Sequence, residues 1–176
     1  IHEAGDCAFE AGLPLVISHH KCAGPSQWGR TRETLPLIDQ LAQRQDIAMD
    51  VYPYLAGPTV LRAGLIDGVI DVLLTWSDPH PEMGGRLLAD IAVEWGVDQL
   101  AAARRLMPGG ACYFQMHEDD VERVIAHPRC MIGSDGVPHD RHPHPRLWGA
   151  FPRVLARYWR GSTRGNAPHS RGCGCR

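Results

Sequence analysis

Three short apolar runs, each followed by polar or ionisable side chains, constrain the fold of this chain more than any other feature. They cover residues 13–18, 47–51 and 129–134. The first is a continuous apolar run, which is typical of a strand buried on both faces, as in a parallel sheet. Helical patterns lie between the runs, so strand, helix and strand form a right-handed parallel crossover. The order of elements predicts an α/β fold, either a barrel or a doubly wound sheet.

Helical spacing fills the segments between these strands. Leu35, Ile38 and Leu41 recur at three- and four-residue intervals, which places them on one face of a helix. The other predicted helices are residues 4–11, 86–95, 98–106, 118–126 and a stretch that begins at Phe151.

Two segments do not follow the alternation of strands and helices. Residues 57–85 mix prolines with short apolar patches and are expected to be irregular, within an insertion that spans residues 55–95. Residues 161–176 contain no acidic residue and no aliphatic residue larger than alanine, so they lack the side chains for a core. We therefore expect residues 1–160 to be one domain with an insertion, and residues 161–176 to be an unstructured tail or a reading-frame artefact.

The composition excludes several classes of partner. The formal net charge is −2, and no dense basic stripe precedes the last segment, so a nucleic-acid partner is not expected. No run approaches the roughly 18 consecutive apolar residues of a membrane span. The six cysteines form no Cys-x-x-Cys pair, which favours a reducing, cytoplasmic setting. The sequence leaves the oligomeric state open.

Two of the strand ends concentrate ionisable side chains. Asp135 lies between Gly133 and Gly136 after the third strand, and these glycines are expected to let the backbone turn sharply. His19 and Lys21 follow the first strand. Because α/β barrels place catalytic groups at the carboxyl ends of strands, both places are candidate site positions. Structural roles stay open, since a histidine can be a hydrogen-bonded core residue and an aspartate between glycines can be a turn residue.

Four separated parts of the chain carry a family resemblance. They are residues 17–21 (ISHHK), 29–35 (GRTRETL), 50–54 (DVYPY), and 133–136 (GSDG) with 143–149 (PHPRLWG). Together, and in this order, they resemble the N-acyl-D-amino-acid deacylases, the D-aminoacylases of the amidohydrolase superfamily. The resemblance implies the C-terminal part of a metal-dependent (β/α)8 TIM-type barrel, with its sixth, seventh and eighth strands.

The resemblance also implies a Zn²⁺ cofactor and its ligands. His19 would be a zinc ligand from the sixth strand, with His20 as the alternative. Asp135 would be the catalytic carboxylate after the eighth strand and would also contact the metal. We favour His19 because His19 and Lys21 are two residues apart, and on an extended strand such residues share one face.

The implied reaction is hydrolysis of the amide bond of a small N-acyl-D-amino acid. Lys21, Tyr52 and Arg146 would surround the carboxylate of that substrate. A planar guanidinium such as that of Arg146 suits a bidentate contact with a carboxylate. Asp135 would take a proton from the attacking water and pass it to the leaving amine.

Other functions remain open at this point. A related amidohydrolase acting on cyclic amides, similar to a dihydroorotase or a hydantoinase, would use the same chemistry. A non-catalytic barrel remnant would use none of it. The remaining metal-binding segments of the family, including a His-x-His pair, are expected upstream of Ile1. The isolated 176-residue chain is therefore expected to be inactive.

Overall fold

A three-stranded parallel sheet forms one part of the protein, which is described here by a computed structural model covering residues 1–136 and 142–159. Its strands lie in the order β1-β2-β6, and their bounds are Leu15–Ile17, Ile47–Val51 and Cys130–Ile132. Leu15 pairs with Ile47, and Val51 pairs with Ile132. The α/β fold class is confirmed, and all three predicted strands are present.

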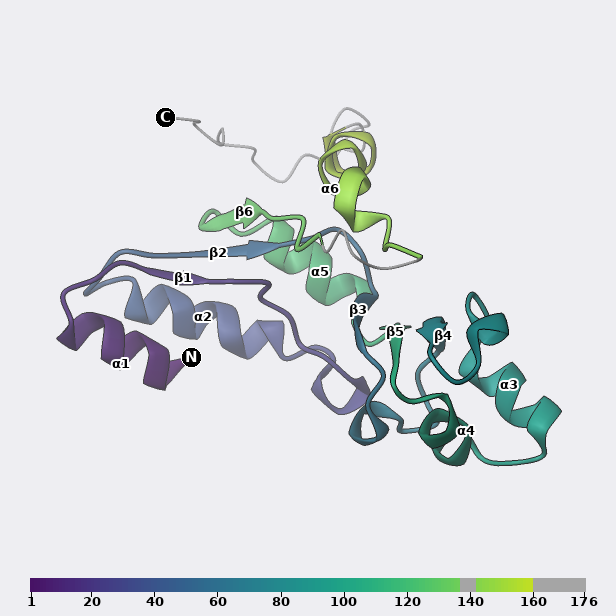
Figure 1. Cartoon of the computed structure of the whole chain (residues 1–176). Coiled ribbons are helices and arrows are strands. Elements are labelled where there is room, and N and C mark those ends of the chain that lie inside the picture. Colours follow the sequence, from purple (N-terminus) through teal and green to yellow (C-terminus); the bar gives the residue numbers. More distant parts are fainter. Residues whose placement is uncertain (137–141, 160–176) are drawn as a thin grey trace.

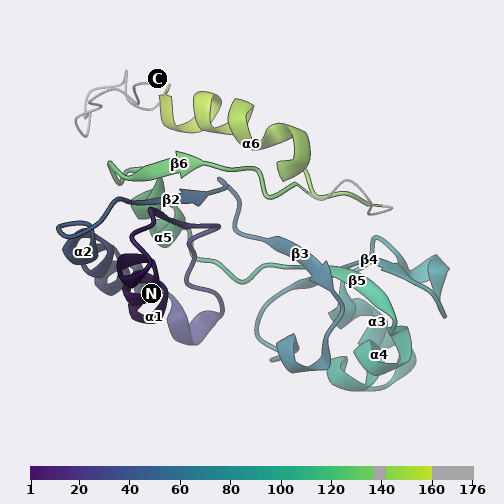
Figure 2. The ribbon, with the colours of Figure 1, turned by 60° about the vertical axis from the view of Figure 1, so that its left-hand side comes forward.

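Helices cover one side of this parallel sheet. They are α1 (His2–Glu10), α2 (Thr31–Leu41) and α5 (Glu118–Ile125), and all three lie on the same side in both views (Figures 1 and 2). The predicted face of α2 is confirmed, because Leu35, Ile38 and Leu41 are buried against Met49 and other side chains of β2. Burial of such side chains stabilises the fold by about 1.5–3 kcal/mol each.

A second sheet occupies the predicted insertion. Its strands are antiparallel in the order β3-β5-β4, with bounds Gly57–Val60, Gly109–Tyr113 and Val72–Ser77. Two helices, α3 (Leu88–Trp95) and α4 (Gln99–Leu106), pack with this sheet, and Gly96 separates them in the left-handed conformation. The expectation of irregular structure over residues 57–85 is wrong, because β3 and β4 of an ordered antiparallel sheet lie in this segment. The helix predicted over residues 86–95 is present as α3.

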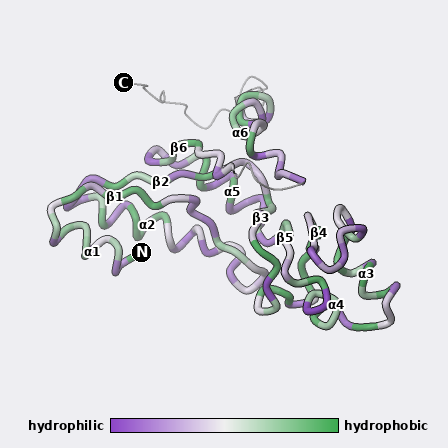
Figure 3. The backbone as a smooth tube through the Cα atoms, viewed as in Figure 1, coloured by the Kyte–Doolittle hydropathy of each residue, from purple (hydrophilic) through white to green (hydrophobic). Residues whose placement is uncertain are grey.

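The second unit has a core of its own. Its largest buried side chains include Leu74, Leu88, Ile91, Leu106 and Tyr113. Hydrophobic segments lie in both units, on the strands and on the helices that pack against them (Figure 3). The two units therefore bury separate clusters of apolar side chains.

Helix α6 (Arg146–Val154) lies on the side of the parallel sheet opposite to α1, α2 and α5 (Figures 1 and 2). It continues as a π-helix over Leu155–Trp159. Short 3-10 turns complete the structure at residues 25–27, 63–65 and 81–83. The helix predicted from Phe151 begins five residues earlier, at Arg146, so this candidate site residue lies in its first turn.

The predicted tail and the expected lack of a membrane span are considered together. Residues 161–176, the predicted tail, lie outside the described residues. Within the described residues, no helix combines the length and the apolar character needed to cross a membrane.

Candidate active site

The three parallel strands bring their carboxyl ends to one edge of the sheet. His19 follows β1, Tyr52 follows β2 and Asp135 follows β6. The Nε2 atom of His19 lies 3.4 Å from Oδ1 of Asp135. Two residues that are 116 positions apart in the sequence (135 − 19) are thus neighbours at the predicted edge.

The backbone turns sharply at both of these residues. His19 has φ of 53° and Asp135 has φ of 46°, and they are the non-glycine residues with positive φ in the described part of the chain. Such conformations are sparsely populated and cost about 1–3 kcal/mol where they are held. The prediction that His19 lies on an extended strand is wrong, because His19 lies in a turn after β1. The sharp turn after β6 is present, but Asp135 itself adopts the left-handed conformation in it.

Arg146 provides the strongest partner of the Asp135 carboxylate. Its Nη1 atom donates to Oδ2 of Asp135 at 2.7 Å, and the arginine is only 2% exposed. Nδ1 of His144 accepts the backbone N–H of Arg146 at 3.0 Å. Burial, together with the nearby Arg146 charge, lowers the pKa of His144 to about 4. His144 is thus neutral at neutral pH and can accept this bond, which fixes the start of α6.

Two cations lie over the ring of Tyr52. The guanidinium carbon of Arg146 is 4.5 Å from the ring centroid, and Nζ of Lys21 is 4.9 Å from it. Among the described residues, the Tyr52 hydroxyl and Nε of Arg146 are both buried without a hydrogen-bond partner. Since buried polar atoms are almost always paired, this group is suited to an acceptor with several lone pairs, such as a carboxylate.

Gly57 of β3 makes room for this arrangement. A Cβ atom at this position would lie 2.8 Å from the Tyr52 hydroxyl oxygen and 3.9 Å from Nη1 of Arg146. The backbone of the antiparallel unit therefore lies next to the Tyr52 hydroxyl and the Arg146 guanidinium. Neither Gly57 nor His144 was among the predicted site residues. The Pro-His-Pro-Arg order was a signal for His144, whereas no local pattern marks Gly57.

His20 faces away from this edge. It is 6% exposed, and its Nε2 atom shares a 2.9 Å hydrogen bond with Oγ1 of Thr34 in α2. Burial is the main cause that lowers the pKa of His20, and the nearby His127 also lowers it. The structure therefore gives His20 a core position and brings His19 to Asp135.

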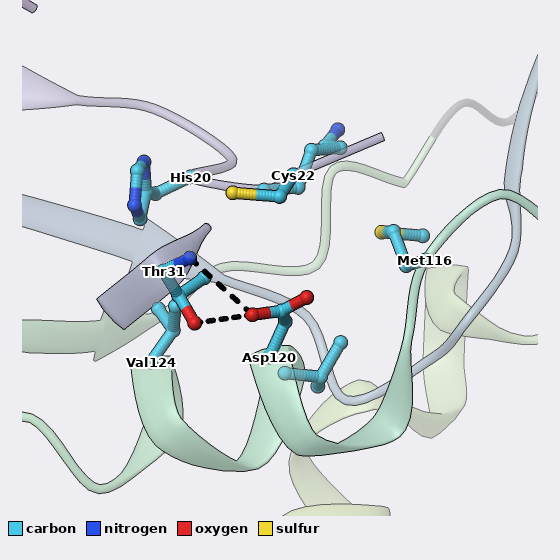
Figure 4. Close-up of a pocket in the computed structure, with 8 residues that line it drawn as sticks. His20, Cys22, Thr31, Met116, Asp120 and Val124 are labelled. Carbon is cyan, nitrogen blue, oxygen red and sulfur yellow. Dashed lines mark hydrogen bonds between the residues drawn. The ribbon is translucent and has the colours of Figure 1, made fainter. Parts of the chain in front are cut away.

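A polar cluster fixes the loop that carries these histidines. Oδ1 of Asp120 in α5 accepts from the backbone N–H and the hydroxyl of Thr31, as drawn in Figure 4, and Oδ2 accepts from the backbone N–H of Gly29 at 2.6 Å. His20, Cys22 and Met116 lie around the same small pocket (Figure 4). Asp120 is 2% exposed and thus anchors the start of α2 to α5 beneath the site.

The donor set of the edge fits part of a metal site. An imidazole nitrogen and a carboxylate oxygen are ligand types that Zn²⁺ takes, and His19 and Asp135 present them side by side. Catalytic zinc sites hold about three protein ligands. Within residues 1–136 and 142–159, no group of three His, Cys, Asp or Glu side chains is placed to hold a metal ion. At this edge the described residues bring together two side chains of ligand type, His19 and Asp135.

Three curated proteins of Alcaligenes xylosoxydans xylosoxydans are similar to the chain over most of its length. N-acyl-D-glutamate deacylase is 53% identical over 150 residues, D-aminoacylase is 50% identical over 151, and N-acyl-D-aspartate deacylase is 46% identical over 146. These alignments cover 85%, 86% and 83% of the chain. The chain belongs to the N-acyl-D-amino-acid deacylase family. It spans 31%, 31% and 29% of the lengths of these deacylases.

Solved structures of deacylases agree with this family assignment. N-acyl-D-glutamate deacylase from Bordetella bronchiseptica, solved with zinc and a phosphonate mimic of the tetrahedral intermediate, superposes with a TM-score of 0.86 at 50% identity. A D-aminoacylase superposes with a TM-score of 0.85 at 46% identity. Each match covers 92% of this chain and 34% of the deacylase chain. No family model matches the sequence.

Proposed function

We propose that the protein containing this chain hydrolyses the amide bond of N-acyl-D-amino acids with the help of zinc. The observation that carries the proposal is the Asp135 carboxylate, held between His19 and Arg146 at the strand edge. The family of the chain and the zinc in the Bordetella deacylase structure support it. The products are a carboxylate and a D-amino acid.

His19 and Asp135 would hold the zinc together with ligands from outside the described residues. Zinc, when bound, makes water nucleophilic at neutral pH and polarises a carbonyl oxygen. Asp135 would accept a proton on a carboxylate oxygen from the attacking water. The same carboxylic acid then gives that proton to the amine nitrogen as the C–N bond breaks, so the leaving group departs as a neutral amine.

Lys21, Tyr52 and Arg146 are proposed to bind the carboxylate of the substrate. They form a cationic group around one aromatic ring, and the Tyr52 hydroxyl and Nε of Arg146 need acceptors. A carboxylate fixed there would orient the neighbouring acyl amide, which is how positioning contributes to rate. Hydantoins lack this free carboxylate, so the group favours an open-chain N-acyl amino acid over a hydantoin.

For the fold, we propose that the parallel sheet is the sixth to eighth strands of a (β/α)8 barrel and that residues 55–95 belong to an insertion. β1 and β6 are edge strands in the described structure. Val16 on β1 is 52% exposed and Met131 on β6 is 44% exposed, on the face opposite to α2 and α5. Barrel interiors are filled by apolar strand residues, so closure would bury both side chains.

The experiment is an assay of the complete protein with N-acetyl derivatives of D-methionine, D-glutamate and D-aspartate and of their L-enantiomers. We expect D-selective release of the free amino acid, loss of activity after zinc removal by a chelator, and recovery when zinc is restored. Absence of turnover with every D-substrate by a zinc-loaded, folded protein would rule the proposal out.

The two histidines provide a matched pair of variants. We expect His19→Ala in the complete protein to lower zinc content and activity by at least about tenfold, because it removes an imidazole ligand. His20→Ala is expected to keep zinc and to lower the melting temperature instead, since it leaves Thr34 without its buried partner. Zinc analysis and thermal unfolding of both variants distinguish these outcomes. The reverse pattern would identify His20 as the ligand.

A further inference from the structure

Asp50 lies beneath the turn that presents His19. It is the fourth residue of β2, and its Oδ1 atom accepts the backbone N–H of His19 at 2.8 Å. Its carbonyl oxygen accepts the backbone N–H of His20 at 2.8 Å. One aspartate therefore binds two successive amides of the turn that follows β1, where His19 adopts its left-handed conformation.

The same carboxylate is packed against the chain that leaves β6. A Cβ atom at Gly133 would lie 2.9 Å from Oδ1 and 3.0 Å from Cγ of Asp50. Gly133 extends the parallel pairing of the strands, because its N–H donates to the carbonyl of Val51 at 3.1 Å. Only a residue without a side chain can pass this close to the carboxylate. Asp135 follows two residues later.

Asp50 thus contacts both turns of the candidate site without touching the reacting groups. It is on the face of the sheet that also carries Val16 and Met131, since it pairs with Met131 in the register. A hydrogen bond to a charged acceptor is shorter and stronger than a neutral one. Such a bond can hold His19 in a conformation that the backbone rarely adopts by itself.

We infer that Asp50 is a positioning residue, which sets the spacing between His19 and Asp135 and thereby the geometry for zinc. The inference rests on the proposed function. Groups that orient metal ligands typically change metal affinity by about 10–100-fold when they are removed. Asp50 would act through the backbone of the ligand, by fixing the direction in which the His19 imidazole points.

The test compares zinc affinities of complete proteins by competition with a chelator. We expect Asp50→Ala to weaken zinc binding by about 10–100-fold. Asp50→Asn keeps an oxygen acceptor at this position, so it should recover most of the affinity. Asp46→Ala is the matched control, because Asp46 is an exposed aspartate at the opposite end of β2. Hydrogen exchange at the His19 amide should become faster in Asp50→Ala alone, which reports the lost bond independently of zinc.

Gly133→Ala tests the contact from the other turn and decides the question if Asp50→Ala does not fold. Its methyl group should displace the Asp50 carboxylate and weaken zinc binding. In the double variant Asp50→Ala/Gly133→Ala, the alanine methyl group at position 133 has room because the carboxylate is gone. The loss of zinc affinity in the double variant should therefore be smaller than the product of the losses in the two single variants. Zinc affinity equal to wild type in both single variants would overturn the inference. A folded wild-type protein that binds no zinc would overturn the proposed function as well, so the two failures are distinguishable.

Discussion

Asp135→Asn is expected to lower kcat of the complete protein by about 10²–10⁴-fold, the usual contribution of a positioned proton-transfer group. Asparagine has nearly the same shape as aspartate, so the change removes basicity and charge with little loss of packing. The neutral amide has no carboxylate oxygen to accept the proton from water. It would also replace the 2.7 Å ion pair with Arg146 by a weaker, uncharged contact.

The measurements for Asp135→Asn are steady-state rates with N-acetyl-D-amino acids, zinc content and thermal unfolding. A folded variant that binds substrate but turns it over slowly would separate catalysis from structure. Asp46→Asn is the matched control, because Asp46 is an exposed aspartate just before β2, at the end of the parallel sheet opposite to the candidate site. If Asp135→Asn retained wild-type kcat, Asp135 would be a turn residue, and a non-catalytic role of this edge would be favoured.

The parts of the fold that the sequence predicted are those in which the local pattern agrees with burial. The spacing of Leu35, Ile38 and Leu41 predicted the buried face of α2, because one apolar stripe is what a helix needs to pack on a sheet. The two helices predicted over residues 86–95 and 98–106 are α3 and α4, and Gly96 between them ends α3 in a left-handed conformation that glycine adopts readily. Both signals are local in the sequence, so they can be recognised without knowledge of the tertiary structure.

The antiparallel unit was missed because its signals are not local. β5 has the sequence Gly-Gly-Ala-Cys-Tyr over Gly109–Tyr113, and all five residues are buried. Glycine and alanine give no alternation, and they are needed here because Trp76 approaches closely. A Cβ atom at Gly110 would lie 2.2 Å from Nε1 of that tryptophan. Such a strand is defined by its neighbours, which the sequence order does not reveal.

For the candidate site, strand ends were predicted correctly, but the turns after them were not. The rule that parallel strands place their carboxyl ends at one edge was enough to bring His19, Tyr52 and Asp135 together. The backbone conformations that orient His19 and Asp135 depend on partners such as Asp50, which is separated from His19 by 31 residues. The alternation of apolar and polar residues along a strand does not predict the conformation of the turn at His19, because that turn is held by the carboxylate of Asp50.

Arg146→Ala is expected to have the other large effect, a loss of about 2–5 kcal/mol of transition-state stabilisation, or about 30- to 5,000-fold in kcat/KM for open-chain N-acyl-D-amino acids. The variant loses the guanidinium proposed to bind the substrate carboxylate, so KM should rise. It also leaves Asp135 without its buried cation, so kcat should fall. Steady-state kinetics with open-chain and cyclic amides measure both effects.

Arg146→Lys separates these two contributions, because it keeps a positive charge for Asp135 but removes the planar pair of donors. Its kcat should exceed that of Arg146→Ala, while KM stays high, since an ammonium group does not reproduce bidentate binding of a carboxylate. Arg104→Ala is the control, because Arg104 is an exposed arginine on α4. The protein would be a cyclic-amide hydrolase if the wild type were inactive on open-chain substrates and Arg146→Ala left its hydrolysis of cyclic amides unchanged. If Arg146→Lys and Arg146→Ala raised KM equally and left kcat unchanged, the activity of Asp135 would not depend on the cation. Arg146 would then serve substrate binding only.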